Sequence, residues 1–174
     1  MTRVPKGALV LATLLASVTA EAQSRRTVAG LRIGSGLSLG TSNQGEDASL
    51  TQRRTPIYLE ADVRTWIDAT PDPVVGAALR VEVDGRVSAA IVPRAQLMRQ
   101  VGSLEVRAMV GAPFFFAPFS LLGGEAGFEL SIPLGGGWAI ATGLRVDVFF
   151  WGSDLPSGTA IVAIDAVAGM ELRL

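Results

Sequence analysis

The last fifteen residues of the chain alternate between apolar and charged positions. From Ala160 to Leu174, every even-numbered residue is apolar, and the charged residues Asp165, Glu171 and Arg173 all have odd numbers. A period of two residues is the period of a β-strand, whose side chains point alternately to two faces. The pattern therefore predicts a strand with one continuous apolar face.

The same alternation recurs in seven earlier segments, and none of them has the period of a helix. Together the predicted strands cover residues 29–40, 56–67, 74–84, 87–98, 104–114, 120–132, 137–151 and 159–174. Turn-forming residues separate them, and Asp84-Gly85 is the clearest hairpin signal. The segment Gly40 to Thr55 is predicted to be a long loop. The fold class predicted from these segments is all-β.

Within these eight segments, the charged residues all fall on the face opposite the apolar residues. They comprise seven arginines and ten carboxylates. Once one charge fixes the phase of each strand, chance would produce this agreement on the order of once in 500 trials. The strands thus have one apolar face and one ionic face.

The length of the segments distinguishes a membrane barrel, whose apolar face points outward, from a soluble fold, whose apolar face points inward. Strands of about eleven residues, tilted near 40°, stand about 28 Å tall and match a membrane's apolar band of about 25 Å. A soluble sandwich or lipocalin-like barrel would instead bury the apolar face, and its strands are typically nearer five or six residues. The lengths favour an eight-stranded antiparallel up-and-down transmembrane β-barrel.

In such a barrel the charges must face the lumen, because an arginine facing lipid at mid-membrane costs about 2 to 4 kcal/mol. Eight strands leave an interior just wide enough for side chains to fill. We therefore expect a lumen closed by ion pairs. The candidates for its central network lie nearest the middles of the strands: Asp62, Arg64, Arg80, Glu82, Arg107, Glu129, Arg145 and Asp147.

The first 22 residues have the pattern of a cleavable signal peptide. Arg3 and Lys6 precede an apolar run from Gly7 to Ala20, and Ala20-Glu21-Ala22 is a small-x-small cleavage pattern. The run is too short for a membrane-spanning helix, which needs roughly 20 apolar residues. We expect residues 1–22 to direct export and residues 23–174 to form the outer-membrane β-barrel.

Composition argues against several classes of function. The chain has no Cys and no His, and its formal net charge is −1. It therefore lacks the parts of a Ser-His or Cys-His relay and the usual ligands of zinc, and it has no basic balance that would suggest nucleic acid. We expect no enzyme activity, no metal site, no cofactor and no nucleic-acid partner.

Aromatic residues gather at the predicted ends of the strands. They are interpreted as a girdle at the membrane interfaces, with a hydrophobic mouth or partner patch as the alternative. The girdle candidates are Phe114, Phe115, Phe116, Phe119, Trp138, Phe150 and Trp151. Arg53 and Arg54 open the second strand, where they could contact lipid head-group phosphates or remain an ordinary solvated pair.

The export signal, the eight alternating segments, the charged lumen phase and the apolar C-terminal strand together resemble the small outer-membrane barrels of the OmpA/OmpX and OmpW-like type. The resemblance covers essentially residues 23–174. It implies outer-membrane lipids as surroundings and recognition of Met170-x-Leu172-x-Leu174 by the outer-membrane assembly machinery, although that family pattern usually ends in Phe. The oligomeric state stays open.

Three functions are compatible with the sequence. The first is a non-enzymatic outer-membrane protein with a closed lumen that serves envelope integrity or surface interaction. The second is a narrow channel or binder for small hydrophobic molecules, as a likeness to the OmpW type implies. The third is a soluble periplasmic lipocalin-like ligand carrier, which would require the apolar faces to point inward.

Overall fold

The computed structural model describes residues 27–42, 49–67, 73–85, 87–153, 155 and 159–174. The predicted signal peptide, residues 1–22, lies outside the described residues. No helix in the described part of the chain is long and apolar enough to cross a membrane. The strands are β1 (Thr27–Ser42), β2 (Ser49–Arg54), β3 (Tyr58–Trp66), β4 (Pro73–Glu82), β5 (Ser88–Val101), β6 (Leu104–Gly111), β7 (Phe114–Ala117), β8 (Leu121–Gly135), β9 (Trp138–Gly152) and β10 (Ile161–Arg173).

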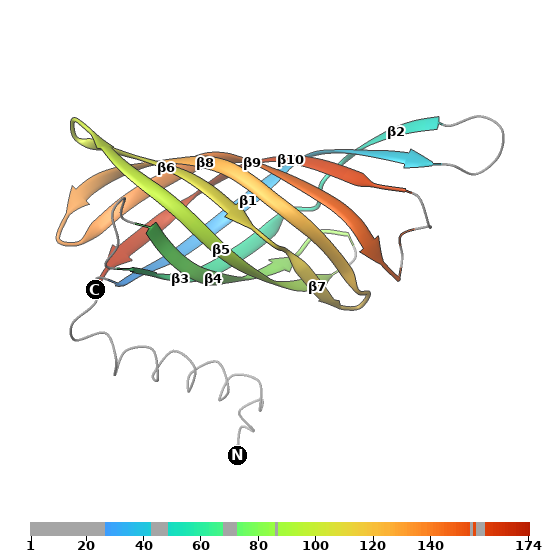
Figure 1. Ribbon diagram of the computed structural model, residues 1–174, viewed down its shortest axis with the longest axis horizontal. Helices are drawn as coiled ribbons and strands as arrows, with labels where there is room; N and C mark the ends of the chain where they lie inside the picture. The colour runs from blue at the N-terminus through green and yellow to red at the C-terminus, as the bar shows by residue number, and fades with distance from the viewer. Residues whose placement is uncertain (1–26, 43–48, 68–72, 86, 154, 156–158) are drawn as a thin grey trace, which may run out of the picture.

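These strands form one antiparallel sheet that closes on itself as a barrel (Figure 1). The first and last strands pair from Val28 opposite Arg173 to Gly40 opposite Ile161. The amide of Leu174 donates to the carbonyl of Thr27 at 2.9 Å. Closure gives every long strand two hydrogen-bonded neighbours, which satisfies the backbone groups that an open edge would leave unpaired.

Two of the barrel's strands are interrupted, so the ten segments make eight barrel strands. β2 and β3 pair with successive parts of β1, residues 37–42 and 27–34. In the same way, β6 and β7 both lie between β5 and β8. Each pair is one strand with a short break, at residues 55–57 and 112–113. The predicted eight-stranded antiparallel up-and-down barrel is confirmed.

The structure differs from the sequence prediction at these two breaks. The predicted loop from Gly40 to Thr55 is wrong in part. Strand β1 extends past the residues that pair with β3, and strand β2 then pairs with this extension and satisfies its backbone groups. The predicted fifth strand, 104–114, was also too long. β6 ends at Gly111, before Pro113, which has no N–H to donate to a neighbouring strand.

The two ends of the barrel are built differently. The terminal end holds Thr27 and Leu174 together with the short turns after β5 and β8, where Gly102 and Gly136 have positive φ values of 64° and 59°. At the distal end, the β1–β2 hairpin projects past the other strands (Figure 1). The predicted Asp84-Gly85 hairpin lies at this distal end between β4 and β5, with Gly85 at φ 78°.

The outer wall of the barrel is apolar. Exposed large apolar side chains occur on every long strand except β4, where Leu79 is half-buried, and they include Leu31, Leu59, Ile91, Val110, Phe128, Leu144 and Ile164. Phe128 is 68% exposed and Leu144 is 61% exposed. Water would penalise so continuous an apolar surface, whereas lipid would not. The soluble lipocalin-like alternative is therefore wrong, because its apolar residues would have to lie inside.

Candidate functional site

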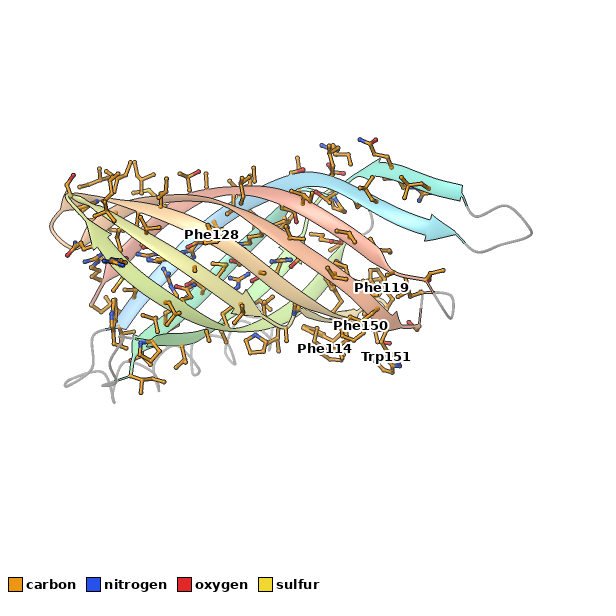
Figure 2. All side chains as sticks on the ribbon, turned by 45° about the horizontal axis from the view of Figure 1, so that its top comes forward. Phe114, Phe119, Phe128, Phe150 and Trp151 are labelled. Atoms are coloured by element: carbon orange, nitrogen blue, oxygen red, sulfur yellow. The ribbon has the colours of Figure 1, made fainter. Side chains whose placement is uncertain are left out.

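The interior of the barrel is filled by charged side chains. Among the described residues, six arginines and eight carboxylates are at most 6% exposed. They are Arg32, Arg64, Arg80, Arg94, Arg107, Arg145, Glu60, Asp62, Glu105, Glu125, Glu129, Asp147, Asp165 and Glu171. The alternation of each strand directs them inward, as the period of two requires. Figure 2 shows side-chain nitrogen and oxygen atoms inside the barrel.

Toward the terminal end, these side chains gather around Glu171 of β10. Arg107 binds Glu171 with two hydrogen bonds, Nη1 to Oε1 at 2.6 Å and Nη2 to Oε2 at 2.7 Å. Arg32 and Arg64 also donate to the Oε1 atom of Glu171. Arg107 donates through Nε to Glu105 at 2.6 Å. Glu171, three residues from the end of the chain, thus joins β1, β3 and β6 to β10.

Nearer the distal end, Glu60 of β3 is the centre of a second cluster of arginines, as Glu171 is of the first. Arg94 binds Glu60 through Nη1 and Nη2, both at 2.6 Å, and Arg145 donates from Nη1 at 2.8 and 2.9 Å. Arg80 donates to Glu60 through Nε at 3.3 Å and to Glu125 through Nη2 at 2.5 Å. Each bond involves an ionised donor and acceptor, which makes it stronger than a neutral hydrogen bond.

Arg145 and Glu129 join the two clusters. The Nη2 atom of Arg145 donates to Glu129 at 2.8 Å, and Glu129 also accepts from Arg32 at 3.2 Å. The connected set, called the lumen network below, draws members from all eight barrel strands. A fork-shaped guanidinium suits this arrangement because it can bind several carboxylates at once.

The structure brings seven of the eight predicted network residues into the lumen network: Asp62, Arg64, Arg80, Arg107, Glu129, Arg145 and Asp147. The prediction for Glu82 is wrong. Glu82 is only half-buried, accepts a hydrogen bond from Ser88, and forms no ion pair with any described residue. It lies at the distal end of β4, beyond the level at which arginines cross the lumen.

Sequence reasoning missed several members of the lumen network, namely Arg32, Glu60, Arg94, Glu125 and Glu171. The alternation placed these residues on the lumen face of their strands, but it did not give their level along the barrel axis. Height depends on the register between strands, which the position of a residue along its own strand does not supply.

Glycines lie directly across from four of the buried arginines, namely Arg32, Arg64, Arg94 and Arg145. Gly169 is opposite Arg32, and Gly127 is opposite Arg145. A Cβ atom at Gly169 would lie 2.1 Å from the carbonyl oxygen of Leu31 and 2.7 Å from Cγ of Arg32. The absence of a side chain therefore gives the long arginine its path across the lumen.

A cavity of about 410 Å³, called the distal cavity below, lies at the distal end of the lumen. One part of its lining is polar, with Tyr58, Arg80, Glu82, Asp147 and Asp165. Another part is apolar, with Phe115, Phe119, Leu121, Phe149 and Ile161. Arg53 and Arg54 lie on its exposed rim, and Arg54 forms an ion pair with Asp84. Contact of these two arginines with lipid phosphates stays a prediction.

Two of the predicted girdle residues belong to this cavity instead. Phe115 is 3% exposed, and its ring lies 5.7 Å from that of Phe149 and 6.0 Å from that of Phe119. The girdle interpretation is wrong for Phe115, and the half-buried Phe119 stacks on it in the cavity lining. Consecutive residues of a strand point to opposite faces, so Phe115 must point inward if Phe114 and Phe116 point outward.

The other aromatic candidates face outward. Phe114, Phe150 and Trp151 lie together at the distal end, whereas Phe128 lies farther along the barrel (Figure 2). Phe116 is 48% exposed, and Trp138, beside the turn at the terminal end, is 46% exposed. Outward aromatic side chains near both ends are typical of strands that cross a membrane.

No group of three or more His, Cys, Asp or Glu side chains in the described part of the chain could hold a metal ion. The charged interior instead consists of arginines and carboxylates that bind each other. These ion pairs connect the strands noncovalently. None of them places a nucleophile beside a general base.

Comparisons with known proteins agree with this fold. No protein-family model and no curated protein matches the chain. Among solved structures, it is similar to Neisserial surface protein A (NspA), with 9% sequence identity and a TM-score of 0.51 over 84% of this chain and 97% of NspA. It is also similar to Ail, the attachment invasion locus protein of Yersinia pestis, with 12% identity and a TM-score of 0.35 over 85% of this chain and 99% of Ail. The chain has the fold of the small outer-membrane β-barrel family.

Proposed function

We propose that the protein is a non-enzymatic outer-membrane barrel whose lumen is closed to ions and solutes, and that it serves envelope integrity or interactions at the cell surface. The observation that carries this proposal is the lumen network. Six buried arginines and their carboxylate partners cross the interior and connect all eight barrel strands.

The network separates the cavities at the two ends of the barrel. The distal cavity is lined by Arg80 and Asp147, and a second cavity of about 360 Å³ at the terminal end is lined by Glu105 and Arg173. Arg145, Glu129 and Glu60 lie between these levels, line neither cavity, and are fully buried. Opening a path would require breaking several charge-assisted hydrogen bonds together, which is costly in a dehydrated interior.

The apolar outer wall and the outward aromatic residues support placement in the outer membrane, with its lipids around the strands. Export by residues 1–22 and recognition of the C-terminal strand by the assembly machinery belong to the same proposal. Outer-membrane barrels have short periplasmic turns and longer external loops. The terminal end of this barrel is therefore expected to face the periplasm, and the β1–β2 hairpin to project from the cell surface.

A conductance measurement tests the closed lumen. In planar lipid bilayers, the purified barrel should produce no stepwise current at moderate voltage, because no water-filled path crosses the network. A large porin reconstituted in the same bilayers is the positive control, since barrels of sixteen or more strands hold an aqueous channel. Regular single-channel steps from the refolded protein would refute the closed lumen and favour the narrow-channel alternative.

A further inference from the structure

One buried carboxylate of the distal cavity, that of Asp165, has no arginine partner among the described residues. Asp165 is 3% exposed and accepts a hydrogen bond from Thr55 Oγ1 at 2.7 Å, but it forms no ion pair with any described residue. Arg145 lies directly across from it in the sheet, yet donates to Glu60 and Glu129 instead. The buried interior as a whole has eight carboxylates for six arginines, and Asp165 is part of that excess.

Asp147, on the neighbouring strand, has an unused acceptor. Its Oδ2 atom accepts from Arg80 at 2.7 Å, whereas its Oδ1 atom is buried and has no hydrogen-bond partner among the described residues. The hydroxyl of Tyr58, which is 2% exposed and lines the same cavity, also lacks a partner in the described structure. Buried polar atoms of this kind are rare unless a ligand or water binds them.

The positions of the two aspartates suit a shared ligand atom. Asp147 pairs with Ala163, two residues before Asp165 on the adjacent strand, so both side chains lie on the lumen face. Diagonal neighbours of this type have Cα atoms about 7 to 8 Å apart. A donor placed between them can therefore reach both carboxylates.

The remainder of the lining is apolar and aromatic. The ring of Phe115 stacks on that of Phe119 and meets that of Phe149 edge to face, and Leu121 and Ile161 pack against this cluster. Aromatic faces attract cations, and a cavity of about 410 Å³ is within the range that binds small molecules. The combination of carboxylates and aromatic rings is the chemistry that recognises organic ammonium ions.

We propose that the distal cavity binds a small organic ammonium ion, with its nitrogen between Asp147 and Asp165 and its apolar body against Phe115, Phe119 and Phe149. The ligand is expected to be a primary amine that carries one ring or a short apolar chain. This site lies distal to the closed part of the lumen, so the inference holds whether or not the barrel conducts.

The arginines near the cavity do not change the expected sign of the ligand's charge. Arg80 is already bound to Glu60, Glu125 and Asp147. Arg53 and Arg54 are exposed at the rim, where water screens their charge, and Arg54 is paired with Asp84. The buried carboxylates, which lie in a lower dielectric, therefore dominate recognition.

Calorimetric titration of the barrel in a nonionic detergent tests the inference with three probes that share one ring. 2-Phenylethylammonium should bind in a saturable manner with one molecule per barrel, whereas 2-phenylethanol and phenylacetate should bind at least tenfold more weakly. Titration into the same detergent without protein corrects for partition into micelles. No saturable binding of the ammonium ion, or equal binding of the neutral or anionic probe, would overturn the inference. Stronger binding of phenylacetate would show that the rim arginines select the ligand.

Variants locate the site. Asp165→Asn should weaken binding of 2-phenylethylammonium by about tenfold or more, because a charged hydrogen-bond partner is lost. Asp84→Asn removes the same charge at the same end of the barrel but outside the cavity lining, and should change the affinity less than threefold. An affinity that is equal in the two variants would contradict the placement. If Asp165→Asn does not fold, the comparison of the three probes on the unaltered barrel still decides the inference.

Discussion

Replacing Arg145 with methionine is expected to lower the free energy of unfolding by about 3 to 5 kcal/mol. The Arg145 side chain is fully buried and donates to both Glu60 and Glu129, so its removal leaves two buried carboxylates with fewer partners. Methionine keeps much of the apolar volume, which limits the contribution of a cavity. Reversible urea unfolding in lipid vesicles measures the change, with the chain's three tryptophans as the fluorescent reporters.

Two further variants separate the network from a general effect of losing an arginine. Arg173→Met removes an arginine whose side chain is 38% exposed and paired with Glu105, and it should cost no more than about 1 kcal/mol. Adding Glu129→Gln to Arg145→Met should recover part of the lost stability, because one unpaired charge is removed as well. Equal losses for the two arginine variants would contradict a buried, cross-linked interior.

Replacing Leu144 with arginine should destabilise the membrane-inserted barrel by about 2 to 4 kcal/mol. Leu144 lies in the middle of β9, next to Arg145, but it is 61% exposed on the outer wall. The two neighbouring positions therefore sit at the same height and face opposite environments. The same side chain that stabilises the barrel at position 145 should oppose insertion at position 144, as urea titrations in vesicles would measure.

Ala163→Arg is the matched control for Leu144→Arg. Ala163 lies on the lumen face beside the distal cavity, directly across from Asp147 and two residues from Asp165. An arginine there can bind both carboxylates, so the loss of stability should be clearly smaller than for Leu144→Arg. A larger loss at position 163 would mean that the lumen, and not the outer wall, excludes an added charge.

The sequence was sufficient to predict which face each strand presents, because alternation is a local property. Strand number, closure and the inward phase of Arg32, Arg80 and Arg145 all follow from period-two patterning and from the cost of placing a charge in lipid. These features need no information about which residue lies opposite which.

The composition of the network could not be predicted because it depends on register. Glu171 lies three residues from the end of the chain, yet it accepts from Arg32, Arg64 and Arg107 on three other strands. The tilt of the strands brings such end positions level with the middles of other strands. Glu82 shows the opposite error, since it lies near arginines in sequence but beyond them in height.

The aromatic cluster was misjudged for a different reason. A run such as Phe114-Phe115-Phe116 is strongly apolar, and composition alone favours the membrane interface for all of it. The backbone of β7 continues to alternate, so Phe115 points into the barrel, where it packs against Phe149. The cavity wall was therefore recognisable only once the strand through these residues was known.

Accessibility of spin labels tests the central claim most directly. The chain has no cysteine, so single substitutions such as Leu59→Cys, Val110→Cys and Leu144→Cys each accept one label. In lipid vesicles, labels at these outward positions should collide with dissolved oxygen far more often than with a water-soluble nickel complex. Preferential collision with the nickel complex at these sites would show that the apolar wall faces water, and would contradict a membrane barrel with ions inside.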